Sequence, residues 1–146
     1  MTKVGLDVRI SEAKGYNSTH MGLRGKGVYL HFNELVDFDS ETFTNLPSLE
    51  RLFLHNNKLQ RIPSGAFKNM ESLKRLRLDS NALVCDCEMV WLVKMLQAKQ
   101  KTTQAAATCQ YPIAMQGKSL ASMSEHDFHC SQYTTLHQLS LQLTQI

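Results

Sequence analysis

The sequence predicts an α/β fold: a right-handed solenoid of about three 24-residue coils, closed at its C-terminal end by a disulfide-bonded cap. Three observations predict it. Leucines and an asparagine recur at a fixed interval, an amphipathic segment follows the last recurrence, and all four cysteines lie between positions 85 and 130. The expected organisation is an unassigned segment at 1–24, repeats at 25–83, a cysteine-rich cap at 84–130 and an unassigned tail at 131–146.

The 24-residue repeat is the strongest of these signals. Each copy has leucines at alternate positions, followed by an asparagine at a fixed distance. One earlier copy keeps the pattern except at Gly25, and Phe43 and Phe67 in the second halves also stand 24 residues apart. Repeats of this length and pattern are typical of leucine-rich repeats. The two complete copies are Leu49-x-x-Leu52-x-Leu54-x-x-Asn57-x-Leu59 and Leu73-x-x-Leu76-x-Leu78-x-x-Asn81-x-Leu83.

Each part of the repeat has a physical role. Leu52 and Leu54 alternate with outward-pointing residues, which predicts a short strand with one buried face. Asn57 follows where the chain turns, and its amide is expected to bond backbone groups of neighbouring coils. A single coil cannot bury its leucines, so stacked coils must share one core. An amphipathic helix is rejected, because leucine spacings of 3, 2, 3 and 2 do not follow a 3.6-residue period.

The four cysteines are expected to form two disulfides. Structural zinc sites usually contain two close pairs of ligands, whereas here only Cys85 and Cys87 are close, with a one-residue spacer. Disulfides in turn indicate an oxidising compartment. Cys85 and Cys87 point different ways in an extended segment, so each is expected to take a separate distant partner. The spacing leaves open which of Cys109 and Cys130 each one takes.

A helix is expected at residues 88–97, directly after Cys87. Trp91, Leu92, Met95 and Leu96 fall on one side of it, and that side is expected to lie on the leucines of the last coil. Trp91 is therefore interpreted as a core residue. An atypical unit of this kind covers the apolar end of a solenoid.

Charge and hydropathy exclude several classes of function. The net charge of +3 is too small to imply a nucleic-acid partner, and no apolar run is long enough to span a membrane. The first residues lack the apolar core of a secretory signal. That absence conflicts with the cysteines, and we expect the natural N-terminus to be missing or replaced in this sequence.

The cap and repeats resemble a known family. The string Asn81-Ala-Leu-Val-Cys85-Asp-Cys87-x-x-x-Trp91-Leu, followed by Cys109 and Cys130, resembles the C-terminal flanking domain of extracellular leucine-rich-repeat proteins. Within that group the sequence is similar to the peroxidasin and peroxidasin-like family over about residues 27–130. The strings that carry this similarity begin at Leu49 (Leu-Glu-Arg-Leu-Phe-Leu-His-Asn-Asn), Leu73 (Leu-Lys-Arg-Leu-Arg-Leu-Asp-Ser-Asn) and Gln104 (Gln-Ala-Ala-Ala-Thr-Cys-Gln-Tyr-Pro).

The resemblance implies several properties. It implies the disulfides Cys85–Cys109 and Cys87–Cys130, and a secreted protein of the extracellular matrix. Members of the family continue into immunoglobulin-like domains and a haem peroxidase domain, but nothing after Cys130 resembles either. We therefore expect a binding module without catalytic residues or cofactors. The alternatives are one part of a larger matrix peroxidase and a structural remnant without function.

The residues between the buried leucines define a predicted binding face. In such solenoids these residues line the concave side. Exposed aromatic residues beside arginines are typical of binding hot spots, which suggests an acidic or mixed-polarity extracellular or matrix protein as the partner. The alternative is a solvated surface on which two of the rings pack against each other, and the sequence favours neither. The predicted contact residues are Tyr29, Arg51, Phe53, Arg75 and Arg77.

The sequence suggests two further candidate sites. His31, His55 and Asp79 are expected to lie side by side on adjacent strands, but an exposed ladder lacks the supporting hydrogen bonds that metal ligands need, so no metal is predicted. Asn17 begins the one Asn-x-Ser/Thr sequence and is a possible glycosylation site. Strands are also considered at 4–8 and at 139–146, where apolar residues alternate with polar ones.

Overall fold

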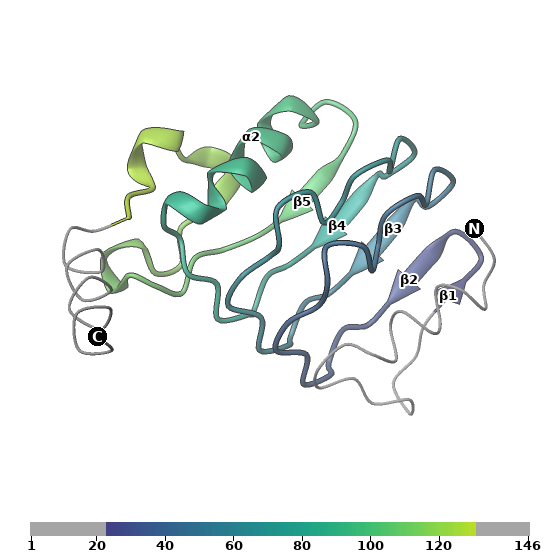
Figure 1. The fold of residues 1–146 in the computed structure, drawn as a ribbon, viewed down its shortest axis with the longest axis horizontal. Helices are drawn as coiled ribbons and strands as arrows, with labels where there is room; N and C mark the ends of the chain where they lie inside the picture. The colour runs from purple at the N-terminus through teal and green to yellow at the C-terminus, as the bar shows by residue number, and fades with distance from the viewer. Residues whose placement is uncertain (1–22, 131–146) are drawn as a thin grey trace, which may run out of the picture.

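The structure, a computed structural model, describes residues 23–130 (Figure 1). The expected strands at 4–8 and 139–146, and the possible glycosylation site Asn17, lie outside the described residues. Five short strands form one sheet in chain order, β1 antiparallel to β2 and the others parallel. The strands are β1 (Leu23–Arg24), β2 (Gly27–Tyr29), β3 (Arg51–Phe53), β4 (Arg75–Arg77) and β5 (Gln104–Ala106).

The repeated leucines form one continuous core. The register pairs Val28 with Leu52 and Leu52 with Leu76, so residues 24 apart stack directly on one another. All three are fully buried, and each such side chain contributes roughly 1.5–3 kcal/mol by leaving water. Figure 1 shows the strands side by side along the length of the molecule, with irregular segments that return the chain from β2 to β3 and from β3 to β4. The predicted α/β solenoid is confirmed.

Asparagine side chains connect successive coils. The Nδ2 of Asn57 donates to the carbonyls of Leu30 in the previous coil and Leu54 in its own, at 3.0 and 2.9 Å. Its Oδ1 accepts from the backbone N–H of Leu35 at 3.1 Å. Asn81 makes the same set of bonds one coil later. The asparagine thus performs the role predicted for it, since it satisfies backbone groups that the turn leaves without strand partners.

The cap begins where the last coil ends. A 3-10 turn η1 (Cys87–Met89) leads into the helix α2 (Val90–Ala98), and the chain then returns as β5. Strand β5 was not predicted. It extends the sheet by pairing in parallel with β4, Arg75 opposite Gln104 and Arg77 opposite Ala106. Three more 3-10 turns complete the cap: η2 (Ile113–Met115), η3 (Leu120–Ser122) and η4 (Glu125–Asp127).

The helix α2 is buried on more than the one side that its sequence pattern predicts. Leu92, Val93 and Leu96 are buried in the same core as the repeat leucines, and the turns η3 and η4 also contact α2. Trp91 is partly buried at the edge of this core. Its indole N–H donates to the carbonyl of Ile62 at 3.3 Å, which satisfies its one polar group. Trp91 therefore packs against the core and does not lie inside it. No helix among residues 23–130 is long and apolar enough to cross a membrane.

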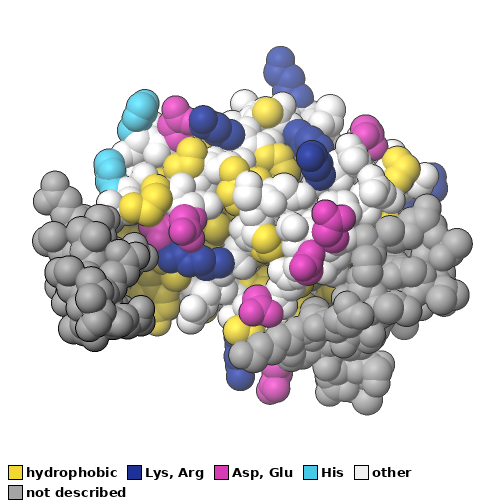
Figure 2. Space-filling model, viewed as in Figure 1, with side chains coloured by type: hydrophobic (Ala, Val, Ile, Leu, Met, Phe, Trp, Pro, Cys, Tyr) yellow, Lys and Arg dark blue, Asp and Glu magenta, His cyan; other side chains and the backbone are white. Residues whose placement is uncertain are grey.

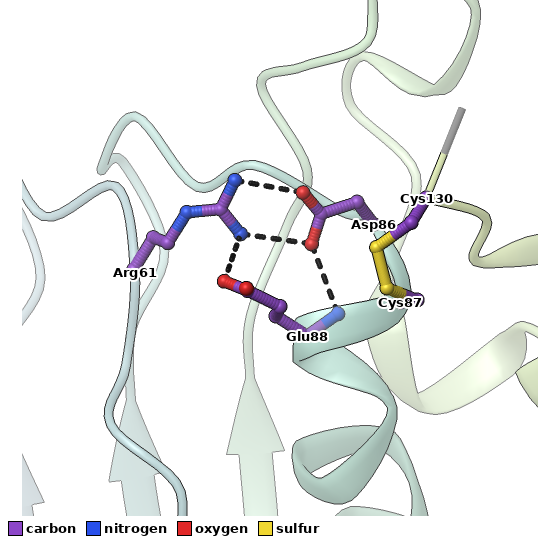
Figure 3. Close-up of a disulfide and its surroundings, with 5 residues drawn as sticks. All are labelled: Arg61, Asp86, Cys87, Glu88 and Cys130. Carbon is purple, nitrogen blue, oxygen red and sulfur yellow. Dashed lines mark hydrogen bonds and ion pairs between the residues drawn. A yellow bond between two sulfur atoms is a disulfide. The ribbon is translucent and has the colours of Figure 1, made fainter. Parts of the chain in front are cut away.

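Two disulfides hold the cap. Cys85 is bonded to Cys109 within the core, where both side chains are almost fully buried. Cys87 is bonded to Cys130 at the surface. Beside this second bond, Arg61 of the preceding coil forms a two-pronged hydrogen bond with Asp86 at 2.7 and 2.8 Å and an ion pair with Glu88 (Figure 3). Asp86 also accepts from the backbone N–H of Glu88, so it begins η1 and ties the cap to the repeats.

Replacing Arg61 with glutamine is expected to lower the free energy of unfolding by about 1 kcal/mol. The two-pronged geometry favours a real contribution, but the Arg61 side chain is 46% exposed and water weakens the pair. Urea denaturation followed by circular dichroism measures the change. Lys74→Gln, which removes an exposed ion pair with Glu50, is the matched control and is expected to cost less. A larger loss for the control would contradict the proposed role of Arg61.

Candidate binding face

The strand register places the predicted contact residues in two neighbouring rows across the sheet. One row contains Gly27, Arg51, Arg75 and, from the cap, Gln104. The second row contains Tyr29, Phe53, Arg77 and Ala106. Neighbouring strands lie about 4.8 Å apart, so side chains within a row are close enough to touch. All five predicted contact residues therefore lie on one face.

Tyr29 is held across the first row. Its ring lies over Gly27, where an added Cβ would stand 2.5 Å from ring atoms, so only glycine leaves room for it. Its hydroxyl accepts a hydrogen bond from Nε of Arg51 at 2.6 Å. Its ring meets that of Phe53 edge-on, with centroids 5.2 Å apart. This ring contact is the one expected if the surface is only solvated, and both residues are partly exposed.

The three arginines are in different electrostatic situations. Arg77 donates two hydrogen bonds to Asp79 at 3.1 and 2.7 Å, so its charge is already compensated. The guanidinium of Arg75 lies over the ring of Phe53, 5.8 Å from its centroid. Among the described residues, the side-chain ion pairs include neither Arg51 nor Arg75. These two adjacent cations are therefore the part of the face best suited to bind an anionic group.

The histidine column forms a stack. The rings of His31 and His55 are parallel within 4°, with centroids 4.6 Å apart. Asp79, the third residue of this column, forms an ion pair with Arg77. Among residues 23–130 no group of three His, Cys, Asp or Glu side chains is arranged to hold a metal ion. Burial, and secondly the nearby charge of Arg77, lower the pKa of both histidines.

The stability of the protein is expected to fall as the pH drops from about 7 to about 5. The pKa of His31 and His55 is lowered in the folded state from an ordinary value of 6.5, so the unfolded chain binds protons more readily. Stability from this pair is present above the unfolded pKa and is lost below it. The charge of His31 lowers the pKa of His55 further, whereas the charge of Asp79 raises it.

Urea denaturation over this pH range measures the effect. The double variant His31→Gln/His55→Gln is the control, and its stability is expected to change less between the same two pH values. A wild-type protein that is equally stable at both ends of the range would contradict the assignment. Asp79 and Asp86 lose their contribution at lower pH. Burial raises the pKa of each carboxyl group, but hydrogen bonds from Arg77 or Arg61 and from the backbone outweigh it, so that both pKa values lie below the ordinary value.

Sequence reasoning did not identify two features of this face. The stacking of the two imidazole rings depends on side-chain orientations that the repeat pattern does not specify. Phe32 stands at the end of the same face with 62% of its surface exposed and a backbone φ of +56°. Its position in the repeat was a usable signal, because the equivalent residues are Asn56 and Ser80, and phenylalanine is unusual at such a position.

Comparison with known proteins identifies the repeats. A family model described as "Leucine rich repeat" matches residues 26–83. This stretch is a leucine-rich-repeat region. The cap that follows it contributes β5 to the repeat sheet, so the leucine-rich repeats and cap share one core.

Three curated relatives match part of the chain. Human "Probable oxidoreductase PXDNL" is 57% identical over 51 residues, which is 34% of this chain and 4% of that protein. Mouse and human "Peroxidasin homolog" are 50% and 48% identical over 51 and 50 residues. They too align over about a third of this chain, 34% and 33%, and over 4% and 3% of their own length. The resemblance to the peroxidasins is confirmed over this third of the chain, which corresponds to a small part of their length.

Two solved structures share the fold. One is a complex of latrophilin 3, Unc5D and the leucine-rich repeats of FLRT2, with a TM-score of 0.62 and 28% identity over 66% of this chain and 30% of the matched one. The other is human trophoblast glycoprotein, Wnt-activated inhibitory factor 1, with a TM-score of 0.59 and 32% identity over 72% of this chain and 39% of that one. Both matches thus share the leucine-rich-repeat fold of this chain.

Proposed function

We propose that this chain is an extracellular protein-binding module, related to part of a peroxidasin-like matrix protein, with no catalytic activity of its own. One observation carries the proposal: Arg51 and Arg75, both without an ion-pair partner among the described residues, contact the partly exposed rings of Tyr29 and Phe53. Aromatic and arginine side chains dominate the energetics of protein interfaces. The partner is an acidic or mixed-polarity protein of the extracellular matrix.

Charge distribution supports a protein partner over a polyanion. Figure 2 shows acidic and basic side chains interspersed on the side of the molecule in view. The net charge of +3 is small. The two disulfides are consistent with an oxidising, extracellular compartment. In the octameric complex, the similar leucine-rich repeats of FLRT2 are assembled with latrophilin 3 and Unc5D, which is a role of the same kind.

Neutralising the two unpaired arginines is the test. The double variant Arg51→Gln/Arg75→Gln is expected to bind about tenfold less to the cell-free matrix deposited by cultured fibroblasts, because two hot-spot contacts are removed. Lys68→Gln/Lys118→Gln changes the net charge equally at exposed positions away from the face and is the control. Arg77 is left intact, because its removal would free Asp79. Equal binding by both double variants would contradict the proposed face.

The alternatives make different predictions. A protein that binds haem would show a Soret absorbance after incubation with haemin, and this chain is expected to show none. A structural remnant would show no cooperative thermal transition. A cooperative melt together with arginine-dependent binding to matrix is the result expected for a binding module.

A further inference from the structure

Phe32 has a backbone conformation that phenylalanine rarely adopts. Its φ of +56° lies in the left-handed region, where the equivalent residues of the next two coils are Asn56 and Ser80, both also at +56°. Asparagine tolerates this region, whereas a bulky aromatic residue is strained there. The Phe32 side chain is also 62% exposed, so burial in the core does not offset the strain. Strained residues of this kind are often retained for binding.

The ring of Phe32 ends a continuous row of aromatic side chains. It meets the rings of His31 and His55 edge-on, with both centroid distances 5.7 Å. His31 and His55 in turn lie 6.0 and 5.7 Å from Phe53, which contacts Tyr29. We call these five residues the aromatic row. The row leads from Phe32 at one edge of the face to the unpaired Arg51 and Arg75, which contact Tyr29 and Phe53.

A hollow lies beside Phe32, where the strands end and the coils turn. Its volume is about 500 Å³, and the asparagine turns of successive coils line it. Glu34 and Lys58 supply one charge of each sign to its lining. Because Phe32 lines this hollow, an apolar side chain of a partner can enter it and pack against the Phe32 ring. The lining residues are Phe32, Asn33, Glu34, Asn56, Asn57, Lys58 and Ser80.

We propose that Phe32 anchors the partner, and that the partner presents an extended segment whose apolar and acidic side chains point to the same side, because they stand two or four positions apart. This inference rests on the proposed binding face and specifies the chemistry of what binds there. The apolar side chain packs on Phe32 and His55, and a carboxylate of the same segment binds Arg51 and Arg75. Side chains two positions apart in an extended chain point the same way about 7 Å apart, which allows one segment to follow the row.

Charge complementarity favours a carboxylate. The acidic residue in the histidine column, Asp79, is already bonded to Arg77. Nε of Arg51 is used by Tyr29, but a guanidinium has five N–H groups, and the remainder suit a two-pronged carboxylate contact. The aromatic row beside the arginines requires an apolar group in the same ligand, which a peptide segment supplies.

The first measurement concerns the fold of a Phe32 variant. Phe32→Asn places in the first coil the residue that the second coil has at the same backbone conformation. The midpoint of thermal unfolding is expected to stay the same or rise, because strain is relieved and little burial is lost. Ile113→Asn, which removes an apolar side chain that is 71% exposed in the cap, is the control for loss of surface hydrophobicity.

Binding is then measured by ¹H–¹⁵N chemical-shift titration of the oxidised full chain with three synthetic peptides. The test peptide is Gly-Leu-Ser-Leu-Ser-Glu-Ser-Glu-Gly, in which the leucines and glutamates stand at every second position and so point to the same side of an extended chain. The second has glutamine in place of every glutamate, and the third has glycine in place of every leucine. The test peptide is expected to shift the amide signals of Phe32, His55 and Arg51, and both other peptides to bind about fivefold more weakly or less. Phe32→Asn is expected to weaken the test peptide to the same extent, and Ile113→Asn to leave it unchanged.

The outcomes separate the two proposals. If Phe32→Asn binds the test peptide as the wild type does while Arg51→Gln/Arg75→Gln loses binding, the role of Phe32 is wrong and the binding face stands. If neither variant changes binding, the proposed face is wrong as well. If the three peptides bind alike, or none shifts these signals, the proposed combination of acidic and apolar side chains on one side of the segment is overturned. A lowered unfolding midpoint for Phe32→Asn would show that Phe32 is a structural residue.

Discussion

Replacing Asn57 with alanine is expected to lower the free energy of unfolding by about 3 kcal/mol, a large share of the stability of a small domain. The amide of Asn57 bonds the carbonyls of Leu30 and Leu54 and the backbone N–H of Leu35. The residue is 8% exposed, so water replaces these partners poorly once the amide is gone. Unsatisfied buried backbone groups are the main cost.

Two further variants isolate the cause. Asn57→Asp keeps an acceptor for Leu35 but removes both donors, and it is expected to be at least as destabilising as alanine. Asn69→Gly removes an exposed amide that bonds Asn45, while glycine accepts the φ of +60° at that position. It is expected to cost less than about 1 kcal/mol. Urea denaturation measures all three. A similar loss for Asn57→Ala and Asn69→Gly would show that the bonds between coils contribute little.

Removing either disulfide is expected to cost about 3–4 kcal/mol, because the unfolded chain regains the entropy of an open loop. The bonded cysteines are 24 residues apart in Cys85–Cys109 and 43 apart in Cys87–Cys130, so the chain-entropy term is similar for the two bonds. The pair Cys85→Ala/Cys109→Ala also loses sulfur atoms that are packed in the core. It is therefore expected to be the more destabilised of the two double variants. The midpoints of thermal unfolding of this variant and of Cys87→Ala/Cys130→Ala measure the difference.

The two bonds are also expected to differ in their access to reductant. Cys87 and Cys130 are exposed, whereas Cys85 and Cys109 are buried, so a mild thiol reductant should open the Cys87–Cys130 bond first. Alkylation and mass spectrometry at increasing reductant concentration determine the order. Simultaneous reduction of both bonds would indicate that the cap unfolds before either bond is attacked.

The sequence predicted the repeats well, because their constraints recur at a fixed distance. Leucines such as Leu52 and Leu76 had to stack, and Asn57 and Asn81 had to bond the neighbouring coil, so register and burial followed together. The same regularity placed Arg51 beside Arg75 and Tyr29 beside Phe53. The residues of the candidate face were accessible to prediction for this reason.

Features that depend on contacts outside the repeat were not predictable. The strand β5 consists of glutamine and alanines, which carry no alternating pattern, and it forms because the edge of β4 offers backbone partners. Val93 is buried because the 3-10 turns of the cap also pack around α2. The pairing of Arg77 with Asp79, which removes one predicted cation from the face, required side-chain geometry.

Disulfide mapping of the protein from an oxidising host tests most directly whether a doubly cross-linked cap closes the stacked coils. Cleavage before Asp86 separates Cys85 from Cys87, and cleavage after Lys118 separates Cys109 from Cys130. Without reductant, mass spectrometry is expected to find the Cys85 peptide joined to that of Cys109, and the Cys87 peptide joined to that of Cys130. Four free thiols, or Cys85 joined to Cys130, would contradict the cap and the extracellular role proposed with it.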